Sequence, residues 1–213
     1  VFADADLDAA VDQAVRTRFQ NAGQSCIAGK RFLVARPIYA AFLEQFVVRV
    51  KELAAHVGDP LHEKTQLGPL ASAAQHNAIE DQLKRSAQLV TVVWQGVAHA
   101  KSVAYFPPSV VSVLDRSAPV WSEETFGPIA ALIAFDEEAE AIEWANDSRF
   151  GLAAAVFTKD AAKGARVAAQ IACGSVTLNG MTISDPSFPF GGVRASGYGR
   201  ELSDACVYEF SNI

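Results

Sequence analysis

The sequence predicts an α/β fold in which helices cover a largely buried sheet. Short apolar segments alternate with stretches of helical periodicity along most of the chain, which is typical of layered α/β domains. Half of the 213 residues are hydrophobic, enough to bury a sizeable core. No internal repeat or low-complexity segment interrupts this alternation. The chain is therefore expected to fold as a globular domain.

A first helix is expected from Asp4 to Asn21, because apolar residues recur there at helical spacing. These residues are Leu7, Val11, Val15 and Phe19. Asp4 or Asp6 can cap its first turn, and Gly23 can end it. A strand is expected next, at Phe32–Ala35.

A second helix is expected to open at Pro37, since proline is favoured in the first turn of a helix. Its apolar face consists of Tyr39, Phe42, Phe46, Val50 and Leu53. The stretch from Gly58 to Leu70 is rich in glycine, proline and polar residues and is expected to be a loop. A helix over Ala71–Ala87 follows it.

The rest of the chain predicts strands separated by two further helices. The strands are Leu89–Trp94, Ser109–Val113, Ile129–Phe135, Ala153–Phe157 and Ser175–Leu178, and the helices are Glu137–Ala145 and Ala161–Ile171.

Composition excludes several classes of function. The net charge is -6, from 24 acidic and 18 basic residues, and no basic cluster suits nucleic acid. No apolar run approaches the length of a membrane span, and no signal peptide is seen, so we expect no membrane partner. The three cysteines include no CxxC pair, which argues against a disulfide framework and a zinc site. We expect a reducing, cytoplasmic location and no bound metal.

Cys26 is the first candidate for chemistry. It follows the first helix in Asn21–Cys26, where Gly23 can place the thiol on a turn with free backbone amides. A buried structural role is the more common one for a lone cysteine and stays open here. A cysteine hydrolase would need a histidine base, but all of the histidines lie far downstream. They are His56, His62, His76 and His99.

Two further segments could form a site. Glu123–Pro128 is an acid pair leading into a Gly-Pro turn, and it could hold a ribose and a flat ring; a charged strand entry with Phe126 in the core is the alternative. Pro189–Glu201 is so rich in glycine that it implies unusual backbone or a close approach. It is not the dinucleotide fingerprint GxGxxG, because no strand-turn-helix unit surrounds it.

In this order, the three segments resemble the GQxC, EExFGP and PFGGVKxSGxGRE segments of the aldehyde dehydrogenase superfamily. The likeness covers essentially the whole chain. It implies a three-layer αβα catalytic domain over residues 1–213, with NAD or NADP as cofactor and an aldehyde as substrate. Cys26 would attack the aldehyde, and its amide would form half of the oxyanion hole. Glu124 would hold the nicotinamide ribose, and Phe126 would pack near the nicotinamide ring.

The resemblance also shows what this sequence lacks. The family's glutamate base precedes the nucleophile, but the first glutamate here is Glu44. The asparagine of the oxyanion hole and the N-terminal dinucleotide-binding domain are likewise absent. We therefore expect these 213 residues alone to be inactive, as the catalytic part of a homodimeric or homotetrameric parent.

Details such as Gly29–Phe32 are similar to bacterial succinate-semialdehyde dehydrogenases. The position where some members carry a carboxylate-binding arginine is Gln20, and Ser184 is a candidate for the far end of the substrate, with a simple turn serine as its alternative. Ala28 stands where some members have a redox-switch cysteine. The competing hypotheses are another semialdehyde or aliphatic aldehyde as substrate, a cysteine acyltransferase or hydrolase, and a non-catalytic assembly module.

Overall fold

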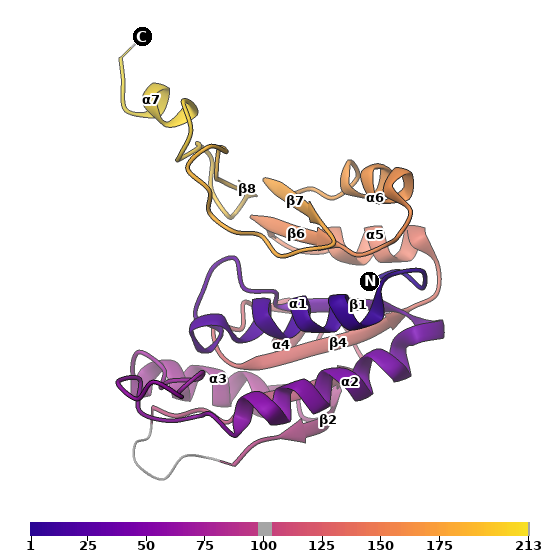
Figure 1. The fold of residues 1–213 in the computed structure, drawn as a ribbon, viewed down its shortest axis with the longest axis vertical. Coiled ribbons are helices and arrows are strands. Elements are labelled where there is room, and N and C mark those ends of the chain that lie inside the picture. Colours follow the sequence, from indigo (N-terminus) through magenta and orange to yellow (C-terminus); the bar gives the residue numbers. More distant parts are fainter. Residues whose placement is uncertain (98–103, 213) are drawn as a thin grey trace.

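The chain begins with a helix that precedes the first strand of the main sheet. In the computed structural model, which describes residues 1–97 and 104–212, α1 spans Leu7–Phe19 (Figure 1). Asp6 is its N-cap, since its carboxylate accepts a hydrogen bond from Ala9 N–H at 3.1 Å. Asp4 instead accepts hydrogen bonds from Thr158 Oγ1 and the Lys159 N–H, so it joins the start of the chain to a distant turn. The expected position of His99 lies outside the described residues.

Four strands form the main sheet, in the order β1-β4-β3-β2. Their bounds are Arg31–Ala35 for β1, Val90–Gln95 for β2, Ser109–Val113 for β3 and Ile129–Phe135 for β4. β4 runs parallel to β1 and to β3, while β2 pairs with β3 in antiparallel fashion. β3 and β4 have the bounds expected from their apolar runs, and nearly every residue of both is buried.

Helices cover this sheet in layers, as the α/β fold class requires. α1 and α2 (Arg36–Ala54) pack together in front of β1 and β4, and α4 (Pro119–Ser122) lies behind them (Figure 1). α3 (Ala73–Arg85) packs against α4 and begins two residues later than expected, because Ser72 is its N-cap and accepts from Gln75 N–H. The expected apolar face of α2 is confirmed by Phe42, Phe46 and Val50, which are fully buried.

A second, smaller group of elements lies beside the main sheet. β6 (Ala153–Val156) and β7 (Ser175–Leu178) form a separate parallel pair, flanked by α5 (Glu138–Asn146) and α6 (Ala161–Ala168). Among the described residues, only Val1 and Phe2 link β1 to the end of β6 through backbone hydrogen bonds. Ala35 N–H donates to Val1 O at 2.9 Å, and Phe2 N–H donates to Phe157 O at 2.9 Å.

Four short elements were not expected from the sequence. They are α4, β5 (Phe150–Gly151), β8 (Val193–Arg194) and α7 (Ala205–Glu209). β5 and β8 form an antiparallel pair that fastens the glycine-rich segment to the turn after α5. The close approach expected of these glycines is confirmed, because a Cβ on Gly174 would lie 1.6 Å from Gly191 O.

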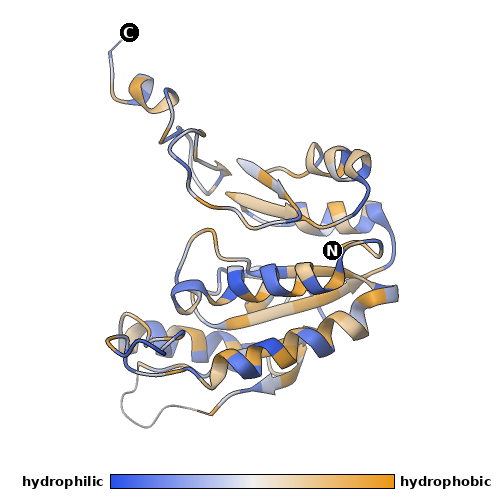
Figure 2. Cartoon of the chain, viewed as in Figure 1, coloured by the Kyte–Doolittle hydropathy of each residue, from blue (hydrophilic) through white to orange (hydrophobic). Residues whose placement is uncertain are grey.

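Hydropathy follows this layering. In Figure 2 the central strand β4 is coloured as apolar, while α1 and α3 carry polar residues among their apolar ones. Within residues 1–97 and 104–212, no helix combines the length and the apolar character that crossing a membrane requires.

Candidate active site

Cys26 is exposed and lies on a loop that follows a turn of unusual backbone conformation. After α1 the chain makes a 3-10 turn, η1 (Gln20–Gly23), in which Asn21, Ala22 and Gly23 all have positive φ, at 48°, 55° and 76°. Such a run is costly for residues other than glycine and persists only where the surroundings enforce it. A Cβ on Gly23 would lie 2.3 Å from Gly127 O. Glycine is therefore required for the loop to touch the segment that carries Glu124 and Phe126.

Arg18 joins these two segments from inside the protein. Its side chain is fully buried, and its Nη2 donates to Gly23 O at 2.9 Å and to Gly127 O at 2.8 Å, while Nη1 donates to Gly29 O at 3.1 Å. Burial lowers the pKa of this guanidinium to about 10, so it stays protonated at neutral pH. Sequence reasoning missed Arg18, because a single arginine in an amphipathic helix gives no sign of burial.

The Lys30 ammonium lies close to all three residues expected to carry the chemistry, Cys26, Glu124 and Phe126. Its ammonium donates to Ser25 O at 2.9 Å and to Cys26 O at 3.3 Å, and lies 3.4 Å from Glu124 Oε1. It also lies 5.5 Å from the centroid of the Phe126 ring. Burial, followed by the nearby Arg18 charge, lowers the pKa of Lys30. The structure thus brings Cys26, Glu124 and Phe126 together around one cation.

The two acids of the Glu123–Glu124 pair have different surroundings. Glu123 accepts two hydrogen bonds from Arg85, at 2.7 and 2.8 Å, and these lower its pKa to about 2. The Glu124 carboxylate is 39% exposed and pairs with Lys30, and both acids line the same cavity as Cys26. Glu123 therefore fastens the segment to α3, and Glu124 is left available to a ligand.

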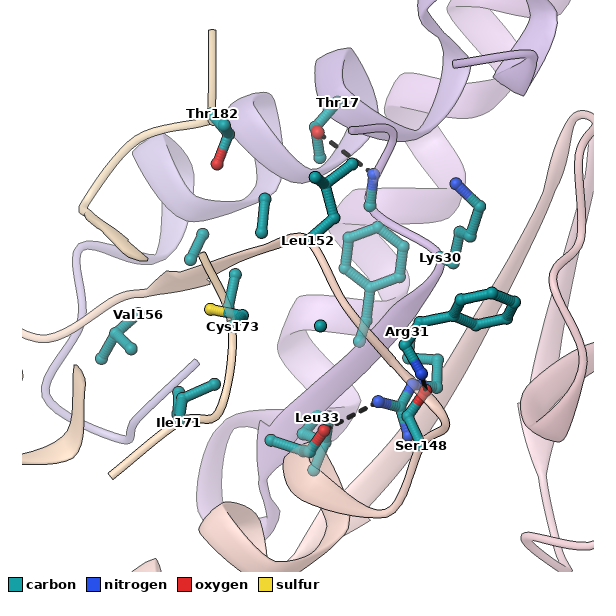
Figure 3. Close-up of a pocket in the computed structure, with 18 of the residues that line it drawn as sticks. Thr17, Lys30, Arg31, Leu33, Ser148, Leu152, Val156, Ile171, Cys173 and Thr182 are labelled. Carbon is teal, nitrogen blue, oxygen red and sulfur yellow. Dashed lines mark hydrogen bonds between the residues drawn. The ribbon is translucent and has the colours of Figure 1, made fainter. Parts of the chain in front are cut away.

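The cavity beside Cys26 has a volume of about 420 Å³ and is lined from both groups of strands. Lys30 and Arg31 enter it from the β1 side, and Val156, Ile171 and Cys173 from the β6–β7 side (Figure 3). Its wall is mostly apolar where β6 and β7 form it. Burial raises the pKa of the Cys173 thiol, which disfavours a thiolate there.

The two substrate candidates lie elsewhere. Gln20 lines a second cavity together with residues of α1 and α2, and its amide donates to Thr17 O at 3.4 Å. Ser184 is exposed, whereas its neighbours Met181 and Thr182 line the cavity that holds Cys26. The structure therefore brings neither Gln20 nor Ser184 to the Cys26 cavity.

The described residues give little support to two other kinds of chemistry, histidine-assisted cysteine hydrolysis and metal binding. None of the three described histidines, His56, His62 and His76, lines the Cys26 cavity, which weakens the case for a cysteine hydrolase. Across the part of the chain that the structure describes, His, Cys, Asp and Glu form no cluster of three that could hold a metal ion.

Comparison with known proteins gives a consistent result. The chain is 42% identical to "Succinate-semialdehyde dehydrogenase [NADP(+)] 1" of Mycobacterium tuberculosis (strain ATCC 25618 / H37Rv), covering 100% of this chain and 46% of that protein. It is 41% identical to "Succinate semialdehyde dehydrogenase [NAD(P)+] Sad" of Escherichia coli (strain K12), again over 100% of this chain and 46% of the relative. The chain thus spans about half the length of these relatives.

Solved structures agree. A betaine aldehyde dehydrogenase from Staphylococcus aureus in complex with NAD+ superimposes with a TM-score of 0.92 at 36% identity, over 98% of this chain and 42% of that one. A structure of Gox0499 gives a TM-score of 0.94 at 37% identity, over 99% of this chain and 46% of that one. The profile described as "Aldehyde dehydrogenase family" matches residues 1–213. The chain belongs to the aldehyde dehydrogenase family.

Proposed function

We propose that this chain forms the catalytic part of an NAD(P)-dependent aldehyde dehydrogenase and that Cys26 is its nucleophile. The observation that carries the proposal is the joint placement of Cys26, Glu124 and Phe126 around Lys30, with Cys26, Lys30 and Glu124 lining one cavity. An exposed thiol on a turn next to a cation suits nucleophilic attack.

The residues of this chain account for the first step of such a reaction, the attack on the aldehyde. The sulfur of Cys26 forms a bond to the aldehyde carbon, and the carbonyl oxygen takes the negative charge. Among the described residues none accepts a hydrogen bond from the Cys26 N–H, so this amide is available to that oxygen. Loss of a hydride from the carbon then leaves a thioester, which water cleaves to the carboxylic acid and the free thiol.

NAD or NADP would supply the hydride acceptor, and two residues fit such a group. The exposed carboxylate of Glu124 can accept hydrogen bonds from ribose hydroxyls. The half-buried ring of Phe126 offers an apolar surface beside it. The cofactors printed for the relatives, NADP(+) and NAD(P)+, support the choice of a nicotinamide dinucleotide.

We further propose that turnover needs a second polypeptide segment that carries a general base and the dinucleotide-binding domain. The relatives are about twice as long as this chain, so they contain further residues that could supply such a segment. Assembly of the longer protein into a homodimer or homotetramer, and its cytoplasmic location, stay predictions.

For the substrate we propose succinate semialdehyde, which two relatives at 41% and 42% identity are named for. A general aliphatic aldehyde or another semialdehyde is the second candidate. It is favoured by the position of Gln20 and Ser184 away from the Cys26 cavity, since neither then binds a substrate carboxylate.

The test is NAD(P)H production by the longer protein, as wild type and as Cys26→Ala, with succinate semialdehyde and with uncharged aliphatic aldehydes. We expect Cys26→Ala to lower turnover at least about 10³-fold, because the covalent route is lost. Turnover that survives this substitution contradicts the nucleophile, and a preference for uncharged aldehydes contradicts the substrate. NAD(P)H production by residues 1–213 alone contradicts the need for a second segment.

Thiol alkylation separates this proposal from a non-catalytic module. In the chain of residues 1–213, iodoacetamide should modify Cys26 faster than Cys173, because burial raises the pKa of Cys173. Equal rates at the two thiols would favour a module that keeps the fold without the chemistry.

A further inference from the structure

We propose that Lys30 is a positioning residue that couples the nucleophile loop to the carboxylate of Glu124, so that the ion pair between them sets the reactivity of Cys26. The inference rests on the proposed function, in which Cys26 is the nucleophile and Glu124 receives the cofactor.

The first support is the set of acceptors around one ammonium group. Lys30 Nζ lies 2.9 Å from Ser25 O, 3.3 Å from Cys26 O and 3.4 Å from Ala28 O, all on the nucleophile loop. The same atom lies 3.4 Å from Glu124 Oε1. An ammonium has three N–H groups, so these four acceptors compete for three donors. A stronger bond to Glu124 therefore weakens the hold on the loop, and a weaker bond strengthens it.

The second support is the charge balance. Arg18, Lys30 and Glu124 act on one another, and the charge of Cys26 in turn acts on Lys30. Two cations and one carboxylate leave a single positive charge, which a thiolate would neutralise. Because the Lys30 side chain is only 18% exposed, water screens these interactions less than at an open surface.

Arg18 and Lys30 differ in what they can do. Arg18 donates only to backbone carbonyls, and those contacts fix where the two segments lie. Lys30 alone of the two contacts both the carbonyl of the nucleophile and the side chain of the carboxylate. A ligand bound at Glu124 and a thiolate at Cys26 therefore both interact with the Lys30 ammonium.

The proposal predicts effects of opposite sign at the two partners. The measurement is the rate of iodoacetamide alkylation at Cys26 in the chain of residues 1–213, followed by mass spectrometry from pH 6 to 9, with Cys173 as internal reference. Lys30→Met should slow alkylation near neutral pH by roughly tenfold, because a cation that interacts with the charge of Cys26 is lost. Glu124→Gln should speed it by roughly threefold, because the carboxylate no longer competes for the ammonium.

Three further variants test coupling and folding. Lys30→Arg, which keeps the charge, should recover most of the lost rate. In the Lys30→Met background, Glu124→Gln should no longer speed alkylation. The control is Lys84→Met, which removes an exposed lysine of α3 that pairs with Glu80, and it should leave the rate unchanged.

Several results would overturn the proposal. These are a wild-type rate in Lys30→Met, equal slowing in Lys84→Met, or additive effects in the double variant. Glu124→Gln keeps the lysine and its loop contacts, so it reports even if Lys30→Met fails to fold. None of these rates depends on turnover, so they test Lys30 separately from the NAD(P)H assay that tests the proposed function.

Discussion

The main sheet with its helices differs sharply from the last forty or so residues of the chain. In the first region, Phe42 and Phe46 of α2 and Leu132 of β4 are fully buried. In the second, Phe188 is 68% exposed and Phe210 is 89% exposed. Cys26 and Glu124 are carried by the first region, and Thr182 faces their cavity from the second. Cys26 and Glu124 thus rest on a packed scaffold, while part of the opposite wall belongs to a segment with exposed aromatic residues.

The largest effect should come from the buried Arg18 guanidinium, which clamps the two site segments together. Arg18→Met removes a donor from the carbonyls of Gly23, Gly29 and Gly127, and it should lower the free energy of unfolding by about 5 kcal/mol. Urea unfolding measures this. Arg49→Met is the control, because that arginine is exposed and solvent screens its ion pairs with Asp8 and Asp12. Equal losses would mean that the clamp adds nothing to the fold.

One pair of phenylalanines tests the contrast between the regions directly. Phe46→Ala should lower the free energy of unfolding by about 4 kcal/mol, because it opens a cavity in the core. Phe210→Ala should change it by less than about 0.5 kcal/mol, because that ring is exposed. A large loss from Phe210→Ala, again in urea, would show that the terminal segment is packed in solution.

Two glycines with positive φ separate conformation from close approach. Gly23→Ala should cost about 3 kcal/mol, from its φ and from the clash with Gly127 O. Gly197→Ala has the conformational cost alone, about 1 kcal/mol, since nothing lies within 4 Å of its Cβ position. Thermal unfolding of both variants gives the difference, and equal costs would contradict the contact between the loop and Gly127.

The smallest effect concerns pH. Because Arg85 lowers the pKa of Glu123 to about 2, this pair stabilises the fold above the ordinary glutamate pKa near 4.5, and the contribution is lost as pH falls toward 2. Both side chains are more than 40% exposed, so solvent screening keeps the effect small. Arg85→Met should therefore flatten the stability profile between these pH values. An unchanged profile measured in urea would show that the ion pair contributes nothing.

The sequence was a good guide where burial and periodicity agree. The runs Ser109–Val113 and Ile129–Phe135 are continuous and apolar, and both strands have the expected bounds. The short elements β5, β8 and α7 were not predictable, because two to five residues carry no period. The pairing of β6 with β7 alone could not be foreseen either, since strand order depends on contacts distant in sequence.

The candidate site shows the same limit. Cys26, Glu124 and Phe126 could be found because each lies in a recognisable segment. Arg18 and Lys30 could not, because their roles arise from acceptors that fold onto them from elsewhere, such as Gly127 O and Glu124 Oε1. A charged residue in a helix or a loop is solvated in most proteins, so neither position attracts notice in the sequence.

The backbone contacts of Arg18 have a consequence for how this region can change. The guanidinium binds carbonyl oxygens of Gly23, Gly29, Thr125 and Gly127, and none of its hydrogen bonds involves another side chain. These hydrogen bonds therefore depend on the backbone path of the two segments and not on the chemistry of their side chains. Exchanges at residues such as Thr125 leave these bonds in place, whereas inserting or deleting one residue in either segment would move the oxygens out of reach. The Arg18 contacts thus constrain the number of residues in the two segments, whereas close approach constrains residue identity at Gly23 and Gly127.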